Sequence, residues 1–342
     1  MSMVVIGIDP HKSSHTAVAV DQAGRKLACK TVRSDNDGLL RLRAWAARFG
    51  TELTWAVEDG RGVAGRLVRT LIGTGATVKW VPPKLMAACR TSARTRGKSD
   101  PIDALAVARA ALREPDLPTA HLDQQALDLR LLTDRRENLV NRRTASINQL
   151  RWHLHDLDPA LDQNHHDLTR PRALATLTSA ITALDPGVRR DLTLDLLTEI
   201  TTLGKQITQL EHQLTERVRP LAPKLLSITG VGAITAAKII GETAGITRFR
   251  SPAAYAMHTG TAPIPVWSSN KPHYRLNRGG NRQLNTCIHR IAITQLAHHP
   301  PARHYRDTWT TNHPHATTKA ALRALKRHLT NTIYQALKAD LT

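Results

Sequence analysis

Four acidic residues occur where carboxylates can share metal ions: Asp9, Glu58, Asp100 and Asp103. Asp9 follows the apolar run VVIGI and Glu58 follows LTWAV, so each ends a predicted strand, where open α/β sheets place their sites. Asp100 and Asp103 open a predicted helix, and their spacing of three puts them on one of its faces. Oxygen ligands without His or Cys select Mg²⁺ or Mn²⁺, and paired ions of this kind support phosphoryl transfer.

Each carboxylate also has a purely structural interpretation. Asp9 could end its strand as a turn former, and the acids at the helix start could interact favourably with the helix dipole. Asp59 competes with Glu58 for the second strand position. Side chains alternate between the two faces of a strand, and Glu58 continues the strand more directly. The joint occurrence of two strand-end acids and one helical pair favours a metal site.

The balance of charge predicts a nucleic-acid partner. The chain of 342 residues has 48 Lys and Arg against 28 Asp and Glu, a formal charge of +20, and a polyanion would offset this excess. Arg94, Arg96 and Lys98, which precede the acidic pair, would line an approach to the metal site with phosphate-binding groups. A merely solvated loop is the alternative for this stretch.

Other bulk features narrow the class of protein. No window approaches the roughly 18 apolar residues of a membrane span, and the first residues read as a strand. We therefore expect a cytoplasmic, nucleoid-associated protein that does not bind membranes. The three cysteines are Cys29, Cys89 and Cys287; their odd number and wide spacing predict reduced packing residues, with neither a disulfide framework nor a zinc site.

The first part of the chain must position the carboxylates. Short β-branched runs alternate with amphipathic stretches there, which predicts an α/β layer. The predicted strands cover 4–8, 16–20, 26–31, 53–57 and 77–81, and the predicted helices cover 38–49 and 62–72. Three strands in a meander followed by strand, helix and strand is the ribonuclease H-like order.

The next part, from residue 123 to about 220, reads as long helices with almost no glycine. Its apolar seam alternates gaps of four and three, as coiled coils do: Leu196, Ile200, Leu203, Ile207, Leu210 and Leu214. A helical hairpin within one chain and a contact between protomers both remain open. Further on, Gly230-Val231-Gly232 predicts a helix-hairpin-helix-like turn whose amides face a phosphate. Ser251-Pro252 predicts the start of a helix that runs to about 258.

A polar, basic loop is expected from 260 to 280, with helices after it. Within the loop Ser268-Ser269 would be an ordinary turn on residue chemistry alone, because serine needs a base or a metal to act as a nucleophile. Arg275, Arg278 and Arg282 surround Gly279-Gly280 at a predicted helix start, so amides and guanidinium groups would converge on a phosphate. Aromatic residues make up only 4% of the chain, which argues against extensive base stacking.

Three stretches of this sequence resemble the acidic motifs of the DEDD transposases of insertion-sequence family one-ten (IS110). They are GIDPHKSSHTAVAVD, WAVEDG and KSDPIDALAVA, and AYAMHTGTAPIPVWSSNKPHYRLNRGGNRQLNTCIHRIA resembles the family's C-terminal transposase domain. The resemblance spans nearly the whole chain. It implies three parts: a RuvC-like catalytic domain at 1–120, a helical coiled-coil connector for oligomerisation at 121–220, and a mainly α-helical domain with the nucleophilic serine at 221–342.

The resemblance also implies a mechanism. Members of this family are recombinases guided by a bridge RNA, and their site is composite. The acidic domain of one protomer holds the metal, and a serine from another protomer attacks a DNA phosphate to form a phosphoserine. The matching position is Ser268, with Ser269 as the second choice because the glycine that usually follows the serine is absent here. A homo-oligomer, dimer to tetramer, follows from this arrangement.

Three other functions compete with this one. A RuvC-like nuclease or junction resolvase shares the carboxylates but does not need the C-terminal part of the chain. A catalytically inactive nucleic-acid-binding protein is disfavoured by the intact Asp9, Glu58, Asp100 and Asp103. Actin-like ATPases and sugar kinases begin in a similar way, but they require a second glycine-rich phosphate loop and an adenosine motif, which we do not find.

Overall fold

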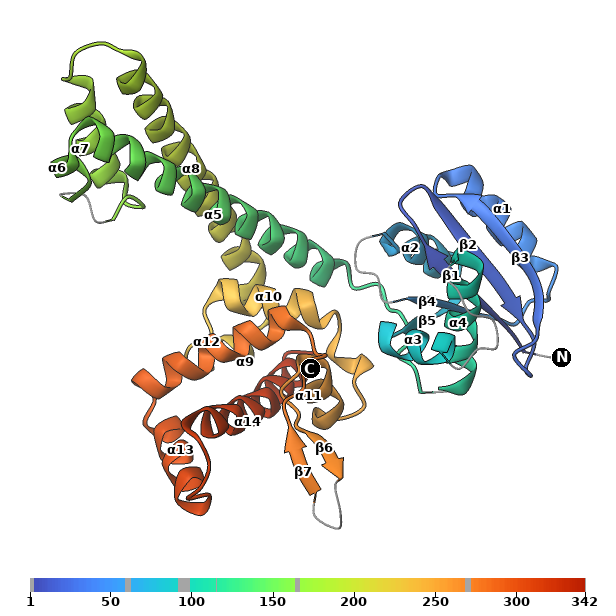
Figure 1. Ribbon diagram of the computed structural model, residues 1–342. Helices are drawn as coiled ribbons and strands as arrows, with labels where there is room; N and C mark the ends of the chain where they lie inside the picture. Colours follow the sequence, from blue (N-terminus) through green and yellow to red (C-terminus); the bar gives the residue numbers. More distant parts are fainter. Residues whose placement is uncertain are drawn as a thin grey trace. The chain divides into compact units, whose positions relative to one another are not determined.

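The computed structural model describes residues 3–58, 63–91, 99–114, 116–163, 167–267 and 272–341. The chain divides into two compact units, Met1–Leu122 and Asp123–Thr342 (Figure 1). The first unit carries a five-stranded sheet and the second is mainly helical. The three-part division expected from the sequence stays a prediction.

A mixed sheet forms the centre of the first unit. Its strands are β1 Val4–Pro10, β2 Ser14–Val20, β3 Lys26–Arg33, β4 Leu53–Glu58 and β5 Thr77–Val81. The spatial order is β3-β2-β1-β4-β5, with β1, β2 and β3 antiparallel in succession and β4 and β5 parallel to β1. The meander and the strand–helix–strand unit are those that the sequence predicted, and the order fits a ribonuclease H-like fold.

Helices cover both faces of this sheet (Figure 1). They are α1 Asn36–Ala47, α2 Gly65–Gly73, α3 Pro83–Thr91 and α4 Asp100–Arg113. Alternate residues of β1 enter two separate cores: Ile6 and Ile8 pack with α1 and α2, whereas Val5 packs with α3 and α4. This period of two fixes which strand-end side chains face α4.

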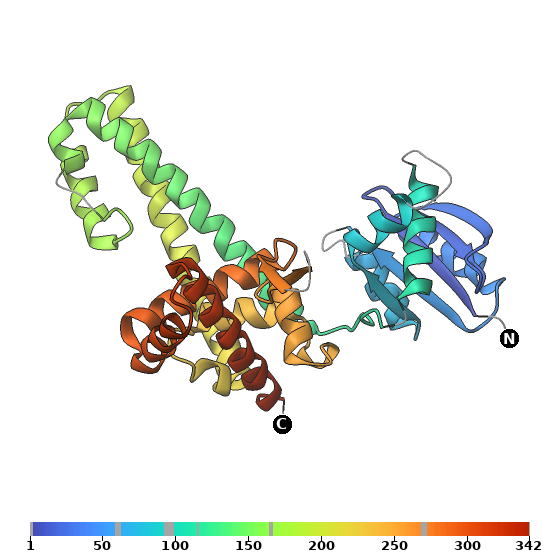
Figure 2. The same ribbon diagram turned by 60° about the horizontal axis from the view of Figure 1, so that its bottom comes forward.

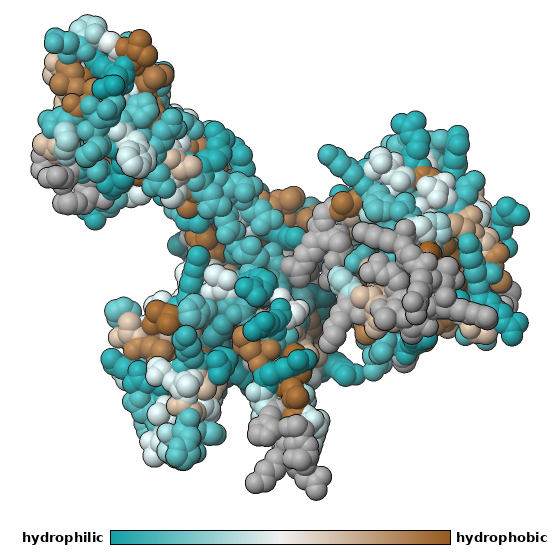
Figure 3. Space-filling view, viewed as in Figure 1, coloured by the Kyte–Doolittle hydropathy of each residue, from teal (hydrophilic) through white to brown (hydrophobic). Residues whose placement is uncertain are grey.

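The second unit begins with a long helical hairpin. Its elements are α5 Gln124–Leu157, α6 Pro159–Gln163, α7 Pro171–Thr182 and α8 Val188–Leu221. Helices α5 and α8 run side by side (Figure 2). The predicted seam is used within the chain, because Leu203 and Ile207 pack against Leu139 of α5. Brown, apolar surface lies at the far end of the hairpin (Figure 3). Trp152 near the end of α5 and Val188 at the start of α8 are highly exposed, at 76% and 78%.

The remaining elements form a helical core with one small hairpin. They are α9 Pro223–Leu226, α10 Ala233–Thr243, η1 Ile246–Arg248, α11 Pro252–Thr259, β6 Ile264–Trp267, β7 Pro272–Arg275, α12 Arg282–His298, α13 Pro300–Asn312 and α14 Thr318–Ala339. The fully buried Tyr255 packs among these helices, and its hydroxyl lies 3.0 Å from Thr243 Oγ1. No helix in the described ranges is long and apolar enough to cross a membrane.

Two expectations for the second unit need adjustment. The continuous polar loop expected from 260 to 280 is wrong, because β6 and β7 form an antiparallel hairpin there. Prolines at 263, 265 and 272 hid the strands, and a two-stranded ribbon tolerates proline because both of its strands are edges. The first helix before Gly230 is only four residues long, and the phosphate role of this turn stays a prediction.

Candidate active site

Asp9 continues the face of β1 that α4 covers. The residues of β1 on this face are Val5, Gly7 and Asp9, because Ile6 and Ile8 point into the other core. Asp9 is only 7% exposed. A carboxylate at the end of a buried strand therefore points towards α4.

Glu58 reaches the same face from the neighbouring parallel strand. Ile8 is the register partner of Val57, so Asp9 and Glu58 are the next residues along the two strands. Ala56 belongs to the α3 and α4 core while Val57 belongs to the other, and alternation places Glu58 with Ala56. The competing Asp59 lies outside the described residues.

Helix α4 brings the other two carboxylates to the strand ends. Asp100 and Asp103 lie in its first turn, with Pro101 also in that turn and Ser99 at the N-cap position. Ser99 makes no side-chain capping hydrogen bond. Asp103 is 8% exposed, whereas the Asp100 side chain is half exposed.

Gly7 sets how closely α4 lies on β1. A Cβ added at Gly7 would lie 2.3 Å from the Ala104 carbonyl oxygen and 2.7 Å from Ala108 Cβ. Any side chain at this position would push the helix away from the strand. Gly7, two residues before Asp9, therefore allows the helix that carries Asp103 to pack closely on β1.

The electrostatics of the cluster oppose the charge on Asp9. Burial raises the pKa of Asp9, the nearby Asp103 and Asp100 raise it further, and His11 works in the opposite direction. His11 Nε2 lies 3.2 Å from Asp9 Oδ2 and 3.3 Å from Asp100 Oδ1. A bound cation is the natural partner for carboxylates gathered in this way.

The donor set fits a divalent metal ion. One donor atom from each of Asp9, His11 and Asp100 lies within 4.8 Å of the others. Sequence reasoning missed His11, although its place two residues after Asp9 was a usable signal. The imidazole adds a nitrogen donor, which Mn²⁺ accepts more readily than Mg²⁺ does.

Several predicted site residues fall outside the described residues. These are Arg94, Arg96 and Lys98 of the basic stretch and the two serines, Ser268 and Ser269. In the sequence the serines come between β6 and β7, and their roles stay predictions.

The predicted phosphate-binding segment lies at the start of α12. Arg275, Arg278 and Arg282 are exposed. Asn281 caps the helix, because its Oδ1 accepts from the amides of Gln283 and Leu284 at 2.9 and 3.2 Å. These two amides are therefore already paired.

The two glycines of this segment differ. A Cβ at Gly280 would lie 2.2 Å from Gly260 Cα, whereas a Cβ at Gly279 would be no nearer than 3.5 Å to any neighbouring atom. Gly280 therefore has a packing role. A nucleic-acid contact stays a prediction for both glycines.

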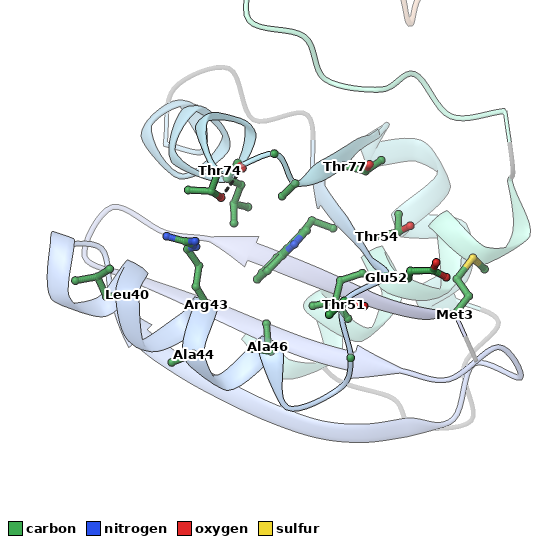
Figure 4. Close-up of a pocket in the computed structure, with 17 residues that line it drawn as sticks. Met3, Leu40, Arg43, Ala44, Ala46, Thr51, Glu52, Thr54, Thr74 and Thr77 are labelled. Carbon is green, nitrogen blue, oxygen red and sulfur yellow. Dashed lines mark hydrogen bonds between the residues drawn. The ribbon is translucent and has the colours of Figure 1, made fainter. Parts of the chain in front are cut away.

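The first unit also has a pocket at the other end of its parallel strands. It has a volume of about 910 Å³ and lies beside residues such as Leu53 and Thr77, where β4 and β5 begin (Figure 4). Asp9 and Glu58 lie where the parallel strands end. This pocket includes none of the four carboxylates.

Two family models match this chain. Residues 6–159 match the family model of DEDD transposases of the IS110 type, described as "Transposase". Residues 222–307 match "Transposase IS116/IS110/IS902 family". The first match contains all four carboxylates, and the second contains both candidate serines.

Individual relatives align over most of their length. The "Insertion element IS900 uncharacterized 42 kDa protein" of Mycobacterium paratuberculosis is 27% identical, covering 97% of this chain and 95% of its own. The "Transposase for insertion sequence element IS1111A" of Coxiella burnetii is 24% identical over 86% of this chain and 78% of its own. Among solved structures, "T. thermophilus RuvC in complex with Holliday junction substrate" aligns at 20% identity, covering 33% of this chain and 95% of its own, with a TM-score of 0.26.

The two family matches, in this order, lie on the two parts of the chain that carry the acidic motifs and the candidate serines. The chain belongs to the IS110 family of DEDD transposases.

Proposed function

We propose that this transposase cleaves and rejoins DNA strands with Mg²⁺ or Mn²⁺ held by Asp9, Glu58, Asp100 and Asp103. The observation that carries the proposal is the proximity of Asp9, at the end of β1, to Asp100 and Asp103 of α4, where burial and these neighbouring acids raise the pKa of Asp9. When bound, such ions neutralise the attacking and leaving oxygens of a phosphoryl transfer.

The protein's own residues would divide the work. Asp9 and Glu58 would hold the ions from the rigid ends of β1 and β4, and Asp103 would do so from α4, whose position Gly7 sets. Asp100 is half exposed and lies 3.3 Å from His11, so it would face the incoming DNA. Three elements packed into one core keep these groups preorganised.

The nucleophile in this proposal is the Ser268 hydroxyl, with Ser269 as the second choice. Its oxygen would bond to the DNA phosphorus while the bond from phosphorus to the deoxyribose oxygen breaks. The proton lost by the serine would pass by way of solvent to that oxygen, which leaves as a DNA hydroxyl. A DNA hydroxyl would then attack the phosphoserine and restore the free serine. The support is the resemblance of this segment to the family, together with the family match over residues 222–307.

Two partners complete the proposal. A guide RNA from the same element would select the DNA by base pairing, which suits a chain with a charge of +20 and few aromatic residues. A homo-oligomer of two to four chains would bring the serine of one protomer to the carboxylates of another. Family resemblance supports both.

The test uses the protein with its element ends, target DNA, the adjacent non-coding RNA and Mg²⁺. We expect recombinant DNA from the wild type and none from Asp9→Asn. A covalent protein–DNA adduct should be lost in Ser268→Ala and kept in Ser269→Ala. As the control, Asp37→Asn removes an exposed carboxylate of α1 and should remain active.

Each component can fail separately. Recombination that survives Asp9→Asn would refute the metal site. Cleavage without any adduct would replace the covalent strand exchange with a RuvC-like hydrolysis. Activity that is independent of RNA would remove the guide while leaving the enzyme class in place.

A further inference from the structure

A groove in the second unit is lined by cations from two sides. Its volume is about 760 Å³, and its lining comes from β7, the start of α12, α13 and α14. Arg275, Arg278 and Arg282 line one side. The four cations of α14 that line it are Lys319, Arg323, Lys326 and Arg327. We call this feature the basic groove.

Helical spacing gathers the α14 cations on one face. Lys319, Arg323 and Arg327 are each four residues apart, so they lie along one stripe of the helix. No Asp or Glu occurs among the described lining residues. Within the described ranges, none of the seven cations forms an ion pair with a carboxylate. A polyanion is the ligand that this charge distribution fits.

Two of the cations are partly withdrawn from water. Lys326 Nζ donates to the Asn285 side-chain oxygen at 2.6 Å, and Arg327 donates to Asn331. Burial lowers the pKa of both Lys326 and Arg327. Their positive charges therefore have only amide partners, and a phosphate would offset the cost of their burial.

Aromatic rings enter the same groove. Tyr305 and Trp309 lie four residues apart on α13, and both line it. Each ring has a histidine stacked on it: His328 on Tyr305 at 4.7 Å and His313 on Trp309 at 4.2 Å between ring centroids. Cations beside flat rings are the arrangement that binds unpaired strands, with phosphates on the cations and bases on the rings.

We propose that the basic groove binds a single strand of DNA. Phosphates would contact Arg275, Arg282 and the α14 stripe, and bases would stack near Trp309. A duplex keeps its bases stacked inside and would offer no base to either ring. The identity of the nucleic acid as DNA rests on the proposed function, whereas the preference for an unpaired strand rests on the groove itself.

Fluorescence anisotropy of a short labelled oligodeoxynucleotide tests the cations, with the full chain in EDTA so that no catalysis takes part. The groove variant combines Lys319→Gln, Arg323→Gln and Arg327→Gln. The control combines Lys205→Gln, Arg217→Gln and Arg219→Gln, which removes the same charge from exposed positions of α8. Circular dichroism confirms that both variants are folded.

We expect the groove variant to weaken binding at least about tenfold, and its salt dependence to fall by about 2 in log–log slope, since each lost contact to a single strand accounts for about 0.7. The control should stay near the wild type. Equal weakening of both variants would overturn the proposal, because net charge alone would then explain the binding.

A second comparison tests the rings. Trp309→Ala should weaken binding of the single strand about tenfold and leave duplex binding unchanged, while Trp152→Ala, at an exposed site on α5, should change neither. Tighter binding of duplex DNA, or of an RNA strand of the same sequence, would refute the proposed ligand. The failure of either comparison leaves the carboxylate chemistry of the proposed function untouched.

Discussion

Asp9 is held by the fold in surroundings that disfavour its ionised form unless a cation is bound. It is buried at a strand end, with Asp100 and Asp103 nearby, and these features raise its pKa. The folded chain therefore bears an electrostatic cost for the ionised form when no cation is bound. Substitution of Asp9 should therefore change the stability of the fold as well as the activity.

We predict that Mn²⁺ or Mg²⁺ raises the thermal midpoint of the wild type, because a ligand that binds only the folded state stabilises that state. The free energy of unfolding should rise by about 2.7 kcal/mol when the metal concentration is 100 times Kd. Asp9→Asn should lose this response and, without metal at neutral pH, should melt no lower than the wild type. Asp37→Asn should keep the response. A metal-induced rise that is equal in wild type and Asp9→Asn would contradict the assignment.

His15 gives a prediction about pH. The residue is 3% exposed, and its Nδ1 has no hydrogen-bond partner in the described structure. Burial lowers the pKa of His15 below its ordinary value of 6.5, and Arg66 and His11 lower it further. The unfolded chain therefore binds the proton more readily, so stability is present above pH 6.5 and is lost as the pH falls through that value.

The measurement is urea unfolding of wild type and His15→Asn between about pH 7.5 and 5.5. The wild type should lose more stability on acidification, by up to about 1.4 kcal/mol per pH unit for this one proton. The difference in slope isolates His15 from the other histidines. Parallel slopes would show that His15 accepts the proton without cost in the folded state.

At the scale of elements, periodicity predicted the five strands of the first unit and the helices α1, α2 and α4, but it missed α3, which begins at the second proline of Pro82-Pro83. The strand ranges, the start of α4 at Asp100 and the helix after Ser251 were all predicted, and Ser251 Oγ accepts from the Ala254 amide at 3.2 Å. The β6 and β7 hairpin was missed because prolines interrupt the strand pattern and three of the four residues of β6 are exposed, so no buried alternation marks the strand. The α14 stripe was also missed, since its cations become a groove only when α12 and α13 are in place.

The contact between Gly260 and Gly280 predicts how two adjacent glycines respond to substitution. Gly280→Ala would place a Cβ 2.2 Å from Gly260 Cα, so we expect a loss of about 1–3 kcal/mol in the free energy of unfolding. Gly279→Ala meets only Asn277 Oδ1 at 3.5 Å and should change stability by about 0.5 kcal/mol or less. Guanidinium unfolding of both variants checks this, and equal losses would contradict the close packing.

At the scale of the whole molecule, the acidic residues and the candidate serines belong to different compact units. The sequence predicted the acidic site largely from the ends of two strands and one helix, because those positions follow from local pattern. It left unpredicted the contact of His11 with Asp100 of α4, and the pairing of Asn281 with the buried Glu242 at 2.6 Å. Both depend on how separate elements meet.

A mixing experiment tests whether the two parts of the site come from different chains. Asp9→Asn and Ser268→Ala should each be inactive alone, and recombination should return when both variants assemble together, because one intact acidic site can meet one intact serine. Coexpression followed by the recombination assay measures this. A mixture as inactive as its components would place both groups in one chain.

The close approach of α4 to Gly7 also limits which substitutions this sequence can accept. The atoms nearest a Cβ at position 7 are the Ala104 carbonyl oxygen and the Ala108 amide nitrogen, so no smaller side chain on α4 can make room for one. Glycine two positions before the first aspartate and a small residue five positions after the last should therefore be inherited together, because Ala108 Cβ also lies close to position 7. This pair of positions would distinguish chains in which a helix can pack this closely on the first strand from the many other chains that begin with an apolar strand and GID.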